Sequence, residues 1–371
     1  MSEFDRRPLC ELADCRMGET ILSKDLDGSG YPIFSADSSA GAWGQKKQIS
    51  KVLKRGSIII GARGTIGNPR LPDHDEFGCT QTTIAVTPSS EVDPCYLKLA
   101  LESSDIKSIA AQQAVPMLTI GQISRLEIPV PPLPEQKKIA EILSGVDREI
   151  AVLLKKKRKL EKTLAAYLSA AIPSDCESME LQEVCKVTDG AHKTPTYATS
   201  GIPFLRVTDI KTGNLDPSSF KYIPEEEHLE LIKRCRPEKG DILLSKNGTI
   251  GVPRLIDWDW DFSIFVSLAL LKIKDRKRLC PEFCELLLKS PSLVSQIFAT
   301  SKQGTVTNLH LEEIRKFKVH LPPYEKQQEI ISEYQALCRL IGACSSLVEK
   351  KKFLRTAITS DLLSGRKRVS V

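Results

Sequence analysis

The sequence predicts an α+β fold: two homologous mixed α/β domains separated by two long helices that pack as an antiparallel coiled coil, in a pseudo-two-fold arrangement. Three observations lead to this prediction. The two halves of the chain repeat each other, each half carries short apolar segments typical of strands, and each half ends in a long helical stripe of apolar residues. A chain of 371 residues is long enough to form two independent cores.

The internal repeat is clearest around a glycine-rich turn. Residues 64–71 read GTIGNPRL and residues 248–255 read GTIGVPRL, so seven of the eight positions are identical. The apolar segments before these turns, residues 56–60 and 240–244, also correspond. The simplest explanation is a duplicated unit of about half the chain, in which each copy builds its own core.

Each copy is expected to run from strands, through a short helix and a proline-bounded strand, into a long helix. Short apolar runs after a glycine indicate the strands of a mixed sheet. In the first copy the expected strands are residues 56–60 and 83–86, the short helix 94–110 and the proline-bounded strand 126–132; in the second copy they are 241–244 and 266–273, 281–299 and 317–323.

The two long helices carry apolar residues in steps of three and four, the pattern of a coiled-coil seam. Each helix would be about 55–60 Å long, far longer than is needed to cover one sheet. The alternative is that each amphipathic helix lies on its own domain. The expected seam residues are Ile139, Leu143, Val146, Ile150, Leu153, Leu160 and Leu164 in the first helix, and Ile330, Leu337, Ile341, Val348, Leu354 and Ile358 in the second.

These patterns divide the chain into five segments. The predicted boundaries are 1–133 for the first domain, 134–172 for the central helix, 173–322 for the second domain, 323–366 for the C-terminal helix and 367–371 for a basic tail. We expect the tail residues Arg366, Lys367 and Arg368 to be disordered.

Composition places the chain among cytoplasmic proteins. The net charge is +6, which permits contact with a polyanion without demonstrating it. No apolar stretch is long enough to span a membrane, and the N-terminus has no signal-peptide core. The eleven cysteines form no C-x-x-C pair, so we expect them to be reduced core thiols.

Catalytic motifs are not found, so the sequence predicts that the chain is not an enzyme. Pro322-Pro323-Tyr324 follows Leu321, where an amino-methyltransferase needs Asp or Asn, and no phosphate-binding loop occurs. Asp73 and residues 135–137 superficially match a nuclease motif, but their wide separation favours a structural role. Glu135 is expected to complement a helix N-terminus. Neither histidines nor cysteines show the spacing of a metal site.

Taken in order, these segments resemble the specificity subunit of a type I restriction-modification system. The matching pieces are the Gly-Asp-Ile-Leu strand at 240–243, the GTIG turn in each half, residues 130–140 (VPPLPEQKKIA) with a weaker copy at 321–327, and residues 304–309 (GTVTNL). The resemblance covers nearly the whole chain. It departs in the first half at residues 115–118 (VPML), where the family has a Gly-Ser-Thr-like turn.

The resemblance implies a non-catalytic subunit that reads double-stranded DNA. Two target recognition domains, residues 1–133 and 173–322, would each specify half of a bipartite site, and the helices would set the spacer between the halves. The implied partners are two methyltransferase (modification) subunits, docked on the helices, and restriction/translocase subunits. S-adenosylmethionine, ATP and magnesium are expected on those partners, and no cofactor is expected on this chain.

Side chains able to contact DNA flank the glycine turns and lie in polar loops. The alternatives are that the glycines only satisfy hairpin geometry and that the loops are simply solvated. The candidates are Trp43, Gln45, Lys46, Lys47, Arg63, Thr65, Gln81 and Thr82 in the first half, and His192, Lys193, Lys246, Asn247 and Thr249 in the second.

Other functions remain open at this stage. The lysine runs 155–159 and 350–352 are either a solvated helix face or contacts to phosphates or an acidic partner. Two alternative functions are a stand-alone two-headed DNA-binding regulator and a protein–protein scaffold. Salt-sensitive binding would separate a DNA-binding protein from a scaffold, because phosphate contacts release counterions.

Overall fold

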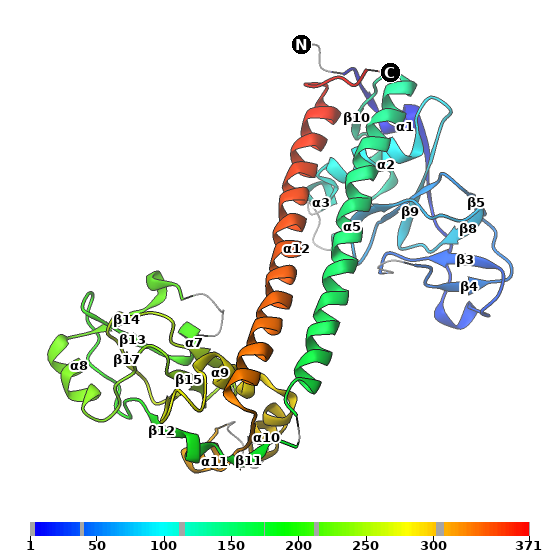
Figure 1. Cartoon of the computed structure of the whole chain (residues 1–371). Helices are drawn as coiled ribbons and strands as arrows, with labels where there is room; N and C mark the ends of the chain where they lie inside the picture. Colours follow the sequence, from blue (N-terminus) through cyan, green and yellow to red (C-terminus); the bar gives the residue numbers. More distant parts are fainter. Residues whose placement is uncertain are drawn as a thin grey trace. The chain divides into compact units, whose positions relative to one another are not determined.

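The structure, a computed structural model, describes residues 4–37, 41–110, 116–173, 175–210, 215–301 and 308–370 (Figure 1). The chain forms two compact units. Unit 1 consists of Met1–Leu154 with Ser346–Val371, and unit 2 consists of Lys155–Ser345. Two long helices, α5 (Leu133–Ala170) and α12 (Tyr324–Ser364), contribute to both units.

Unit 1 is built on an antiparallel four-stranded sheet. The run Ile58-Ile59-Ile60 is fully buried, as expected of β-branched residues in a central strand. The main sheet has the order β2 (Ala13–Met17), β9 (Thr83–Pro88), β6 (Ile58–Gly61), β7 (Gly67–Arg70). A smaller sheet has the order β4 (Gly44–Lys46), β3 (Tyr31–Phe34), β8 (Glu76–Cys79), β5 (Leu53–Lys54), and β1 (Arg6–Pro8) pairs with β10 (Glu127–Pro129).

The helices of unit 1 complete its core. Helix α2 begins where the Asp93 carboxylate accepts a hydrogen bond from the Tyr96 N–H, with Pro94 in the first turn. The core joins the main sheet and α2 to Leu143 of α5 and Leu362 of α12. The described helices are α1 (Leu9–Leu12), α2 (Pro94–Ser103), α3 (Ile106–Ala110) and α4 (Ile120–Ser124), with a 3-10 turn at Ser23–Asp25.

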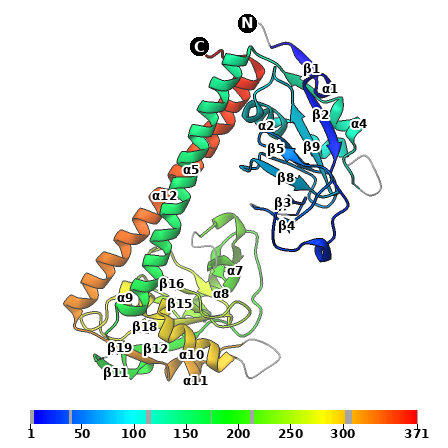
Figure 2. The same cartoon turned by 90° about the vertical axis from the view of Figure 1, so that its right-hand side faces the viewer.

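Unit 2 repeats this plan. Figure 2 shows its strands β15 and β16 beside helix α9. The main sheet has the order β12 (Cys185–Asp189), β18 (Leu268–Ile273), β15 (Ile242–Ser245), β16 (Pro253–Leu255); the small sheet is β14 (Lys221–Ile223), β13 (Ile202–Leu205), β17 (Ser263–Ile264), and β11 (Glu177–Glu180) pairs with β19 (Lys318–Leu321). The helices are α6 (Leu181–Val184), α7 (Val207–Ile210), α8 (Glu225–Ile232), α9 (Pro281–Lys289), α10 (Pro291–Ser301) and α11 (Leu311–Arg315), with a 3-10 turn at Pro217–Ser219.

The two main sheets match residue by residue, which confirms the predicted duplicated α+β fold. In unit 1, Ile84 of β9 pairs with Met17 of β2 on one side and Ile60 of β6 on the other. In unit 2, Ala269 pairs in the same way with Asp189 and Leu244. Met17 therefore corresponds to Asp189, and Ala62, two residues after Ile60, corresponds to Lys246.

A buried glutamine repeats in each unit at the start of its long helix. In unit 1 the Gln136 side chain accepts a hydrogen bond from the Asp93 N–H and donates to the carbonyls of Glu91 and Pro131, at 2.9–3.1 Å. In unit 2 Gln327 accepts from the Cys280 N–H and donates to two carbonyls, those of Arg278 and Pro322, at 2.8–2.9 Å. Both side chains are at most 1% exposed. Each glutamine ties its helix to the strand before it and to the start of α2 or α9.

Helices α5 and α12 pack antiparallel, as predicted. In unit 1, Arg355 of α12 donates to the carboxylate of Asp147 of α5, with Nε 2.6 Å from Oδ1. In unit 2 the Tyr167 hydroxyl of α5 donates to the carbonyl of Ile330 of α12 at 3.1 Å. Residue numbers on α12 fall as those on α5 rise, so the two helices run in opposite directions.

The seam differs from the predicted one at Leu354, which is 48% exposed. The positions between the apolar residues Val348 and Ile358 are occupied by Lys351 and Arg355, which pair with acidic residues of α5. A search for apolar residues alone misses these polar positions, although they continue the steps of three and four. Among the other predicted seam residues, Ile139, Leu143, Ile330 and Val348 are buried, and Val146, Ile150, Leu153, Leu160, Leu164, Leu337, Ile341 and Ile358 are half-buried.

The basic tail is ordered, contrary to the prediction of disorder. The Arg368 guanidinium donates to both carboxylate oxygens of Glu135 and lies over the Phe4 ring, 4.7 Å from its centroid. The Val369 N–H donates to the same carboxylate. Glu135 is 3% exposed, so its charge is neutralised by this arginine rather than by its helix N-terminus alone. The hydrogen bonds from Arg368 lower the pKa of Glu135.

All eleven cysteines are free thiols, but they are not all core residues: Cys10 and Cys95 are exposed. Across the described ranges, no helix is both long and apolar enough to cross a bilayer. In the same part of the chain, no group of three or more His, Cys, Asp or Glu side chains could hold a metal ion.

Candidate nucleic-acid interface

The two glycine-rich turns occupy equivalent places, directly after β6 in unit 1 and β15 in unit 2. Gly64 and Gly248 have the same φ of +74°, a backbone conformation that L side chains rarely adopt. This supports the interpretation that the glycines recur in both halves because the backbone of the turn requires them. A Cβ at Gly248 would meet nothing within 4 Å, so the surface of this turn is open to close approach.

Four of the predicted DNA-contacting residues of unit 1 meet at its glycine turn. The backbone N–H of Arg63 donates to the carbonyl of Thr82, and the Thr65 hydroxyl donates to Asp37 at 3.1 Å. Gln81 accepts a hydrogen bond from the Thr20 hydroxyl at 2.8 Å. The side chains of Arg63, Thr65 and Gln81 are exposed, and Thr82 is half-buried. The structure therefore brings residues 63–65 and 81–82, which are separate in sequence, onto one surface.

The other four candidates of unit 1 lie on or beside β4, the edge strand of the small sheet. Trp43 is 38% exposed, and its N–H donates to the carbonyl of Ile33. The carboxylate of Asp27 accepts from the Lys47 N–H at 3.0 Å, which fixes the start of the loop after β4. Gln45 and Lys47 are exposed and Lys46 is half-buried. Trp43 thus combines an exposed aromatic surface with neighbouring polar side chains.

In unit 2 two of the predicted residues meet on a carboxylate that the sequence analysis did not select. Asp189, at the end of β12, is 2% exposed. The Nζ of Lys246 lies 3.2 Å from Asp189 Oδ2, and His192 Nε2 lies 3.2 Å from the same carboxylate. Lys246 is only 6% exposed, so the structure places it below the surface on which a direct DNA contact would lie. Lys246 directly follows β15, and its charge is compensated by Asp189 of β12, the strand on the other side of β18.

Arg234 is a further member of this group and was missed by sequence reasoning. It forms an ion pair with Asp189, and its Nη2 lies 3.3 Å from His192 Nε2. Arg234 follows α8, more than forty residues from Asp189, so no local motif links them. The only available signal was that an aspartate ends β12 at the place where the equivalent strand of unit 1 ends in Met17. We call Asp189, His192, Arg234 and Lys246 the Asp189 cluster.

The remaining candidates of unit 2 are Lys193, Asn247 and Thr249. Lys193 and Thr249 are exposed. Asn247 is half-buried and forms a single β-bridge with Asn308. The family-like turn at residues 304–309 lies largely outside the described residues, which resume at Asn308.

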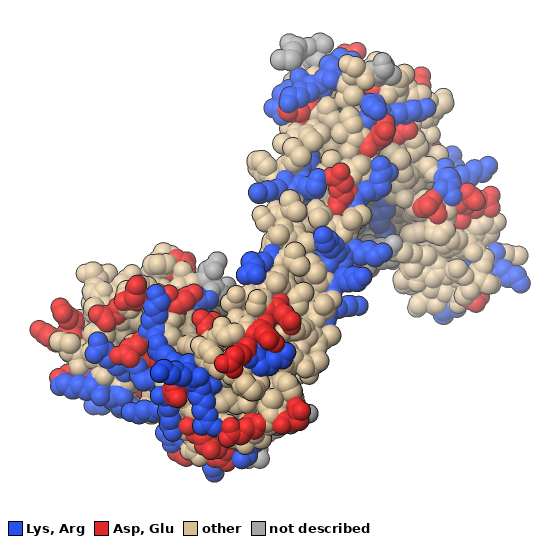
Figure 3. Space-filling model, viewed as in Figure 1, with Lys and Arg blue, Asp and Glu red and all other residues tan. Residues whose placement is uncertain are grey.

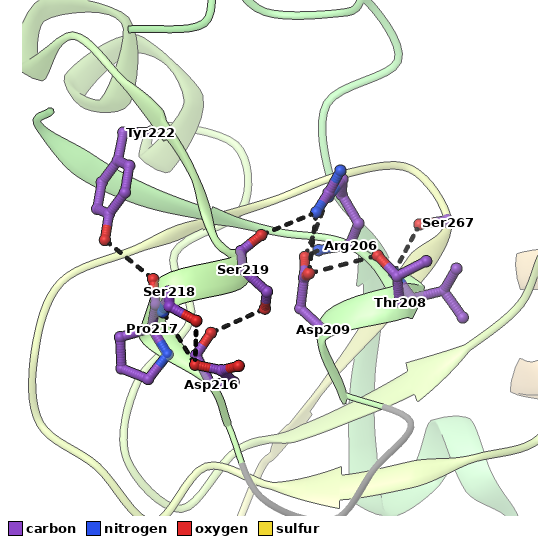
Figure 4. Close-up of polar contacts among 10 residues, drawn as sticks. Arg206, Thr208, Asp209, Asp216, Pro217, Ser218, Ser219, Tyr222 and Ser267 are labelled. Carbon is purple, nitrogen blue, oxygen red and sulfur yellow. Dashed lines mark hydrogen bonds and ion pairs between the residues drawn. The ribbon is translucent and has the colours of Figure 1, made fainter. Parts of the chain in front are cut away.

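A second polar group of unit 2 lies in the loops that follow β13 (Figure 4). The guanidinium of Arg206 forms a bidentate contact with the carboxylate of Asp209, which is 5% exposed. Asp216 caps the following turn by accepting from the N–H and hydroxyl of Ser218. Among the residues of unit 1 that the structure describes, no helical segment follows the equivalent strand β3. These bonds fold a loop of unit 2 that differs from unit 1.

Charge on the surface is mixed rather than of one sign. On the face of unit 2 visible in Figure 3, lysines and arginines lie among acidic residues. In the lysine runs, Lys157 pairs with Glu161 and Lys352 with Glu349 along their helices, while Lys351 reaches Glu149 of the other helix. Most of the run 155–159 is exposed. A surface that binds DNA would therefore be confined to a small part of either unit.

The carboxylates of the nuclease-like motif have structural partners. Asp73 pairs with Arg55, and Glu135 pairs with Arg368. The first belongs to a loop before β8 and the second to the start of α5. Each carboxylate is neutralised separately, as the structural interpretation predicts.

Comparisons with known proteins agree with this architecture. Residues 1–162 and 173–343 each match the family described as the type I restriction modification DNA specificity domain. The MjaVIII specificity subunit of Methanocaldococcus jannaschii is 24% identical over 341 residues, covering 85% of this chain and 77% of the relative. The EcoKI specificity subunit of Escherichia coli is 24% identical over 271 residues, covering 65% of this chain and 57% of the relative.

Solved structures share the fold. The S subunit from M. genitalium superimposes with a TM-score of 0.61 at 19% identity, over 97% of this chain and 96% of that one. A chain from a structural study of complex assembly in the type I R-M system gives a TM-score of 0.64 at 18% identity, over 98% of both chains.

Proposed function

The chain belongs to the type I restriction-modification DNA specificity family, and we propose that it selects the DNA sequence on which a type I complex acts. Unit 1 and unit 2 each read one half of a bipartite site in double-stranded DNA. The chain acts as a recognition subunit, and the chemistry belongs to its partners.

The observation that carries this proposal is a repeated frame with different side chains at the same place. The glycine turns, the main-sheet register and the buried glutamines are shared. The loops around them differ: unit 1 presents Arg63 and Gln81, whereas unit 2 presents the Asp189 cluster. Direct reading of bases depends on the types of side chain offered. Two frames with different loops suit two different half-sites.

The exposed and half-buried candidates are the proposed DNA contacts. Arginine, glutamine and threonine side chains pair with base edges or phosphates. In unit 1 these are Trp43, Gln45, Lys46, Lys47, Arg63, Thr65, Gln81 and Thr82, and in unit 2 His192, Lys193, Asn247 and Thr249. Lys246 is proposed as a support below the surface because it is buried against Asp189.

Helices α5 and α12 are proposed to set the spacer and to dock two methyltransferase subunits, with restriction subunits joining the complex. Their length supports this role: the helices have 38 and 41 residues. Exposed apolar residues on them, Val152, Leu347 and Phe353 among others, offer contact area beyond the helix pair.

The first experiment is sequencing of adenine methylation in cells that express this chain with and without its cognate methyltransferase subunit. We expect a new split motif only when both are present. Tight, salt-sensitive binding to a site by the chain alone, with no methylation, would favour the stand-alone regulator. Binding to protein partners with no DNA association would favour the scaffold.

The same readout tests the helices as a ruler. Removing seven residues from the exposed middle of α5 and seven from the facing stretch of α12 keeps the seam in phase and shortens each helix by about 10 Å. At about 3.4 Å per base pair, we expect a spacer shorter by roughly three base pairs, with both half-sites unchanged. An unchanged spacer would contradict the ruler.

A further inference from the structure

The Asp189 cluster concentrates three basic side chains on one buried carboxylate. Asp189 itself is 2% exposed, and its partners come from three separate segments of unit 2. Lys246 is buried with it, whereas the Arg234 side chain is 57% exposed and that of His192 is 60% exposed. The cluster therefore has a fixed interior and a basic outer surface.

The charges do not cancel. Asp189 supplies one negative charge, while Lys246 and Arg234 supply two positive charges, so the group carries a net charge of +1 with His192 neutral. Glu230 lines the small cavity beside Arg234, but it pairs with Lys233. Lys193, next to His192, is exposed and adds a further positive charge. An excess of positive charge over a fixed carboxylate favours an anionic ligand.

The two equivalent side chains in unit 1 are uncharged. Met17 stands at the position of Asp189, and Ala62 at that of Lys246. The frame of the sheet does not need these charges, because unit 1 folds without them. Retaining a buried ion pair in one copy costs desolvation energy, which points to a use specific to unit 2.

We propose that Arg234 binds a backbone phosphate of the half-site read by unit 2, and that Asp189 and Lys246 are positioning residues for it. This inference rests on the proposed function. It identifies a contact outside the residues that the sequence selected and assigns a purpose to the buried pair. The ligand class is the phosphodiester of duplex DNA.

The contacts of Arg234 favour a phosphate over a base edge. Its Nη2 faces Asp189 Oδ1 and lies 3.3 Å from His192 Nε2, so this corner of the guanidinium is occupied by the protein. A bidentate contact to guanine needs two neighbouring N–H groups, and Nη2 belongs to both such pairs. The remaining Nε and Nη1 hydrogens suit the single hydrogen bonds that phosphate oxygens accept.

The test measures binding of the full chain, assembled with its methyltransferase subunits, to the duplex identified by methylation sequencing. Arg234→Ala should weaken binding about tenfold at low salt and reduce the salt slope by about one, because one phosphate contact is lost. The methylated motif should keep the same bases. Lys277→Ala is the control: this basic residue is exposed and follows β18, at the end of the strand opposite to the partner of Asp189, so both quantities should stay near wild type.

The positioning role requires a second variant. Asp189→Asn alone would leave Lys246 buried without a partner, so the paired substitution Asp189→Asn/Lys246→Met removes both charges together. It should weaken binding as much as Arg234→Ala, and adding Arg234→Ala to it should weaken binding little further. If the paired variant does not fold, Arg234→Lys is measured instead. It keeps the positive charge without the guanidinium group, so it should have the salt slope of the wild type.

Each outcome decides the proposal. Unchanged affinity of Arg234→Ala for the duplex would overturn it. A motif relaxed at one base pair in unit 2's half-site would show a base contact and overturn the phosphate assignment. If the wild-type complex produces no methylated motif and binds no duplex selectively, the proposed function itself fails, a result distinct from either of these.

Discussion

Unit 1 and unit 2 share a backbone frame but differ in what the frame presents. Both have a four-stranded antiparallel sheet in the same register, a glycine turn with the same φ and a buried glutamine at the start of a long helix. At the end of the first sheet strand, unit 1 has Met17 and unit 2 has Asp189. The shared positions build the same frame in both units, and the side chains at its edges and loops differ.

A second difference concerns the start of the long helices. In unit 1, Glu135 is buried and binds the C-terminal tail through Arg368. In unit 2 the residue before the equivalent glutamine is Lys326, which is exposed and pairs with Glu329 on its own helix. The glutamine is thus common to both units, and the tail contact belongs to unit 1.

The largest expected effect tests the shared glutamines. Gln136→Ala should lower the free energy of unfolding of unit 1 by at least about 3 kcal/mol, and Gln327→Ala should do the same for unit 2. The reason is that each substitution leaves one buried N–H and two carbonyls without a partner. Hydrogen exchange measured by mass spectrometry, unit by unit, reports the loss.

The chain provides a matched control beside Gln327. Gln328 lies on the same helix and is exposed, so Gln328→Ala should change stability by less than about 0.5 kcal/mol. If the Gln136 and Gln327 variants affected both units equally, or if only one of them were destabilising, the equivalence of the two positions would be wrong.

An intermediate effect is expected for the tail contact found only in unit 1. Arg368→Ala should destabilise unit 1 by less than either glutamine substitution, because it leaves the buried Glu135 carboxylate without its charged partner but half of the arginine side chain is exposed. Because the folded-state pKa of Glu135 is lowered, its contribution is present above the unfolded pKa of about 4.3 and is lost as pH falls through the folded pKa. Acid unfolding of wild type should therefore be steeper than that of Glu135→Gln.

The control for this contact is Lys367→Ala, since Lys367 is mostly exposed and pairs only loosely with Asp361. Lys326→Ala supplies the comparison in unit 2 and should leave stability there nearly unchanged. A pH dependence of unit 1 that was the same in wild type and Glu135→Gln would contradict the role given to this carboxylate.

The sequence was sufficient to predict the two similar units and the two long helices, because repeated segments and apolar periodicity can be read directly along the chain. The GTIG turns predicted a duplicated unit, and the apolar residues in steps of three and four predicted the two long helices. The antiparallel direction also followed, since the second domain lies between the helices along the chain. These features depend on backbone geometry and on apolar spacing, which a sequence displays directly.

The site was less predictable because its geometry depends on contacts between distant residues. Lys246 looked like a surface residue until Asp189 of another strand was placed beside it. Arg234 joins the same group from a loop after α8, and no spacing rule connects it. Likewise Arg368 was read as part of a loose basic tail, although Glu135 holds it. Ion pairs across long sequence distances leave no periodic trace.

The smallest expected effect separates two apolar residues of α12 that were both predicted to lie in the seam. Ile358 packs against the core of unit 1, whereas Leu354 is 48% exposed. Ile358→Ala should therefore destabilise unit 1 by about 1–2 kcal/mol, and Leu354→Ala should cost less than about 0.5 kcal/mol. Hydrogen exchange in α2 and the main sheet of unit 1 measures the first effect, while unit 2 should be unaffected by either. If the two variants lowered the free energy of unfolding equally, Leu354 would belong to the seam after all, and Lys351 and Arg355 would not occupy it.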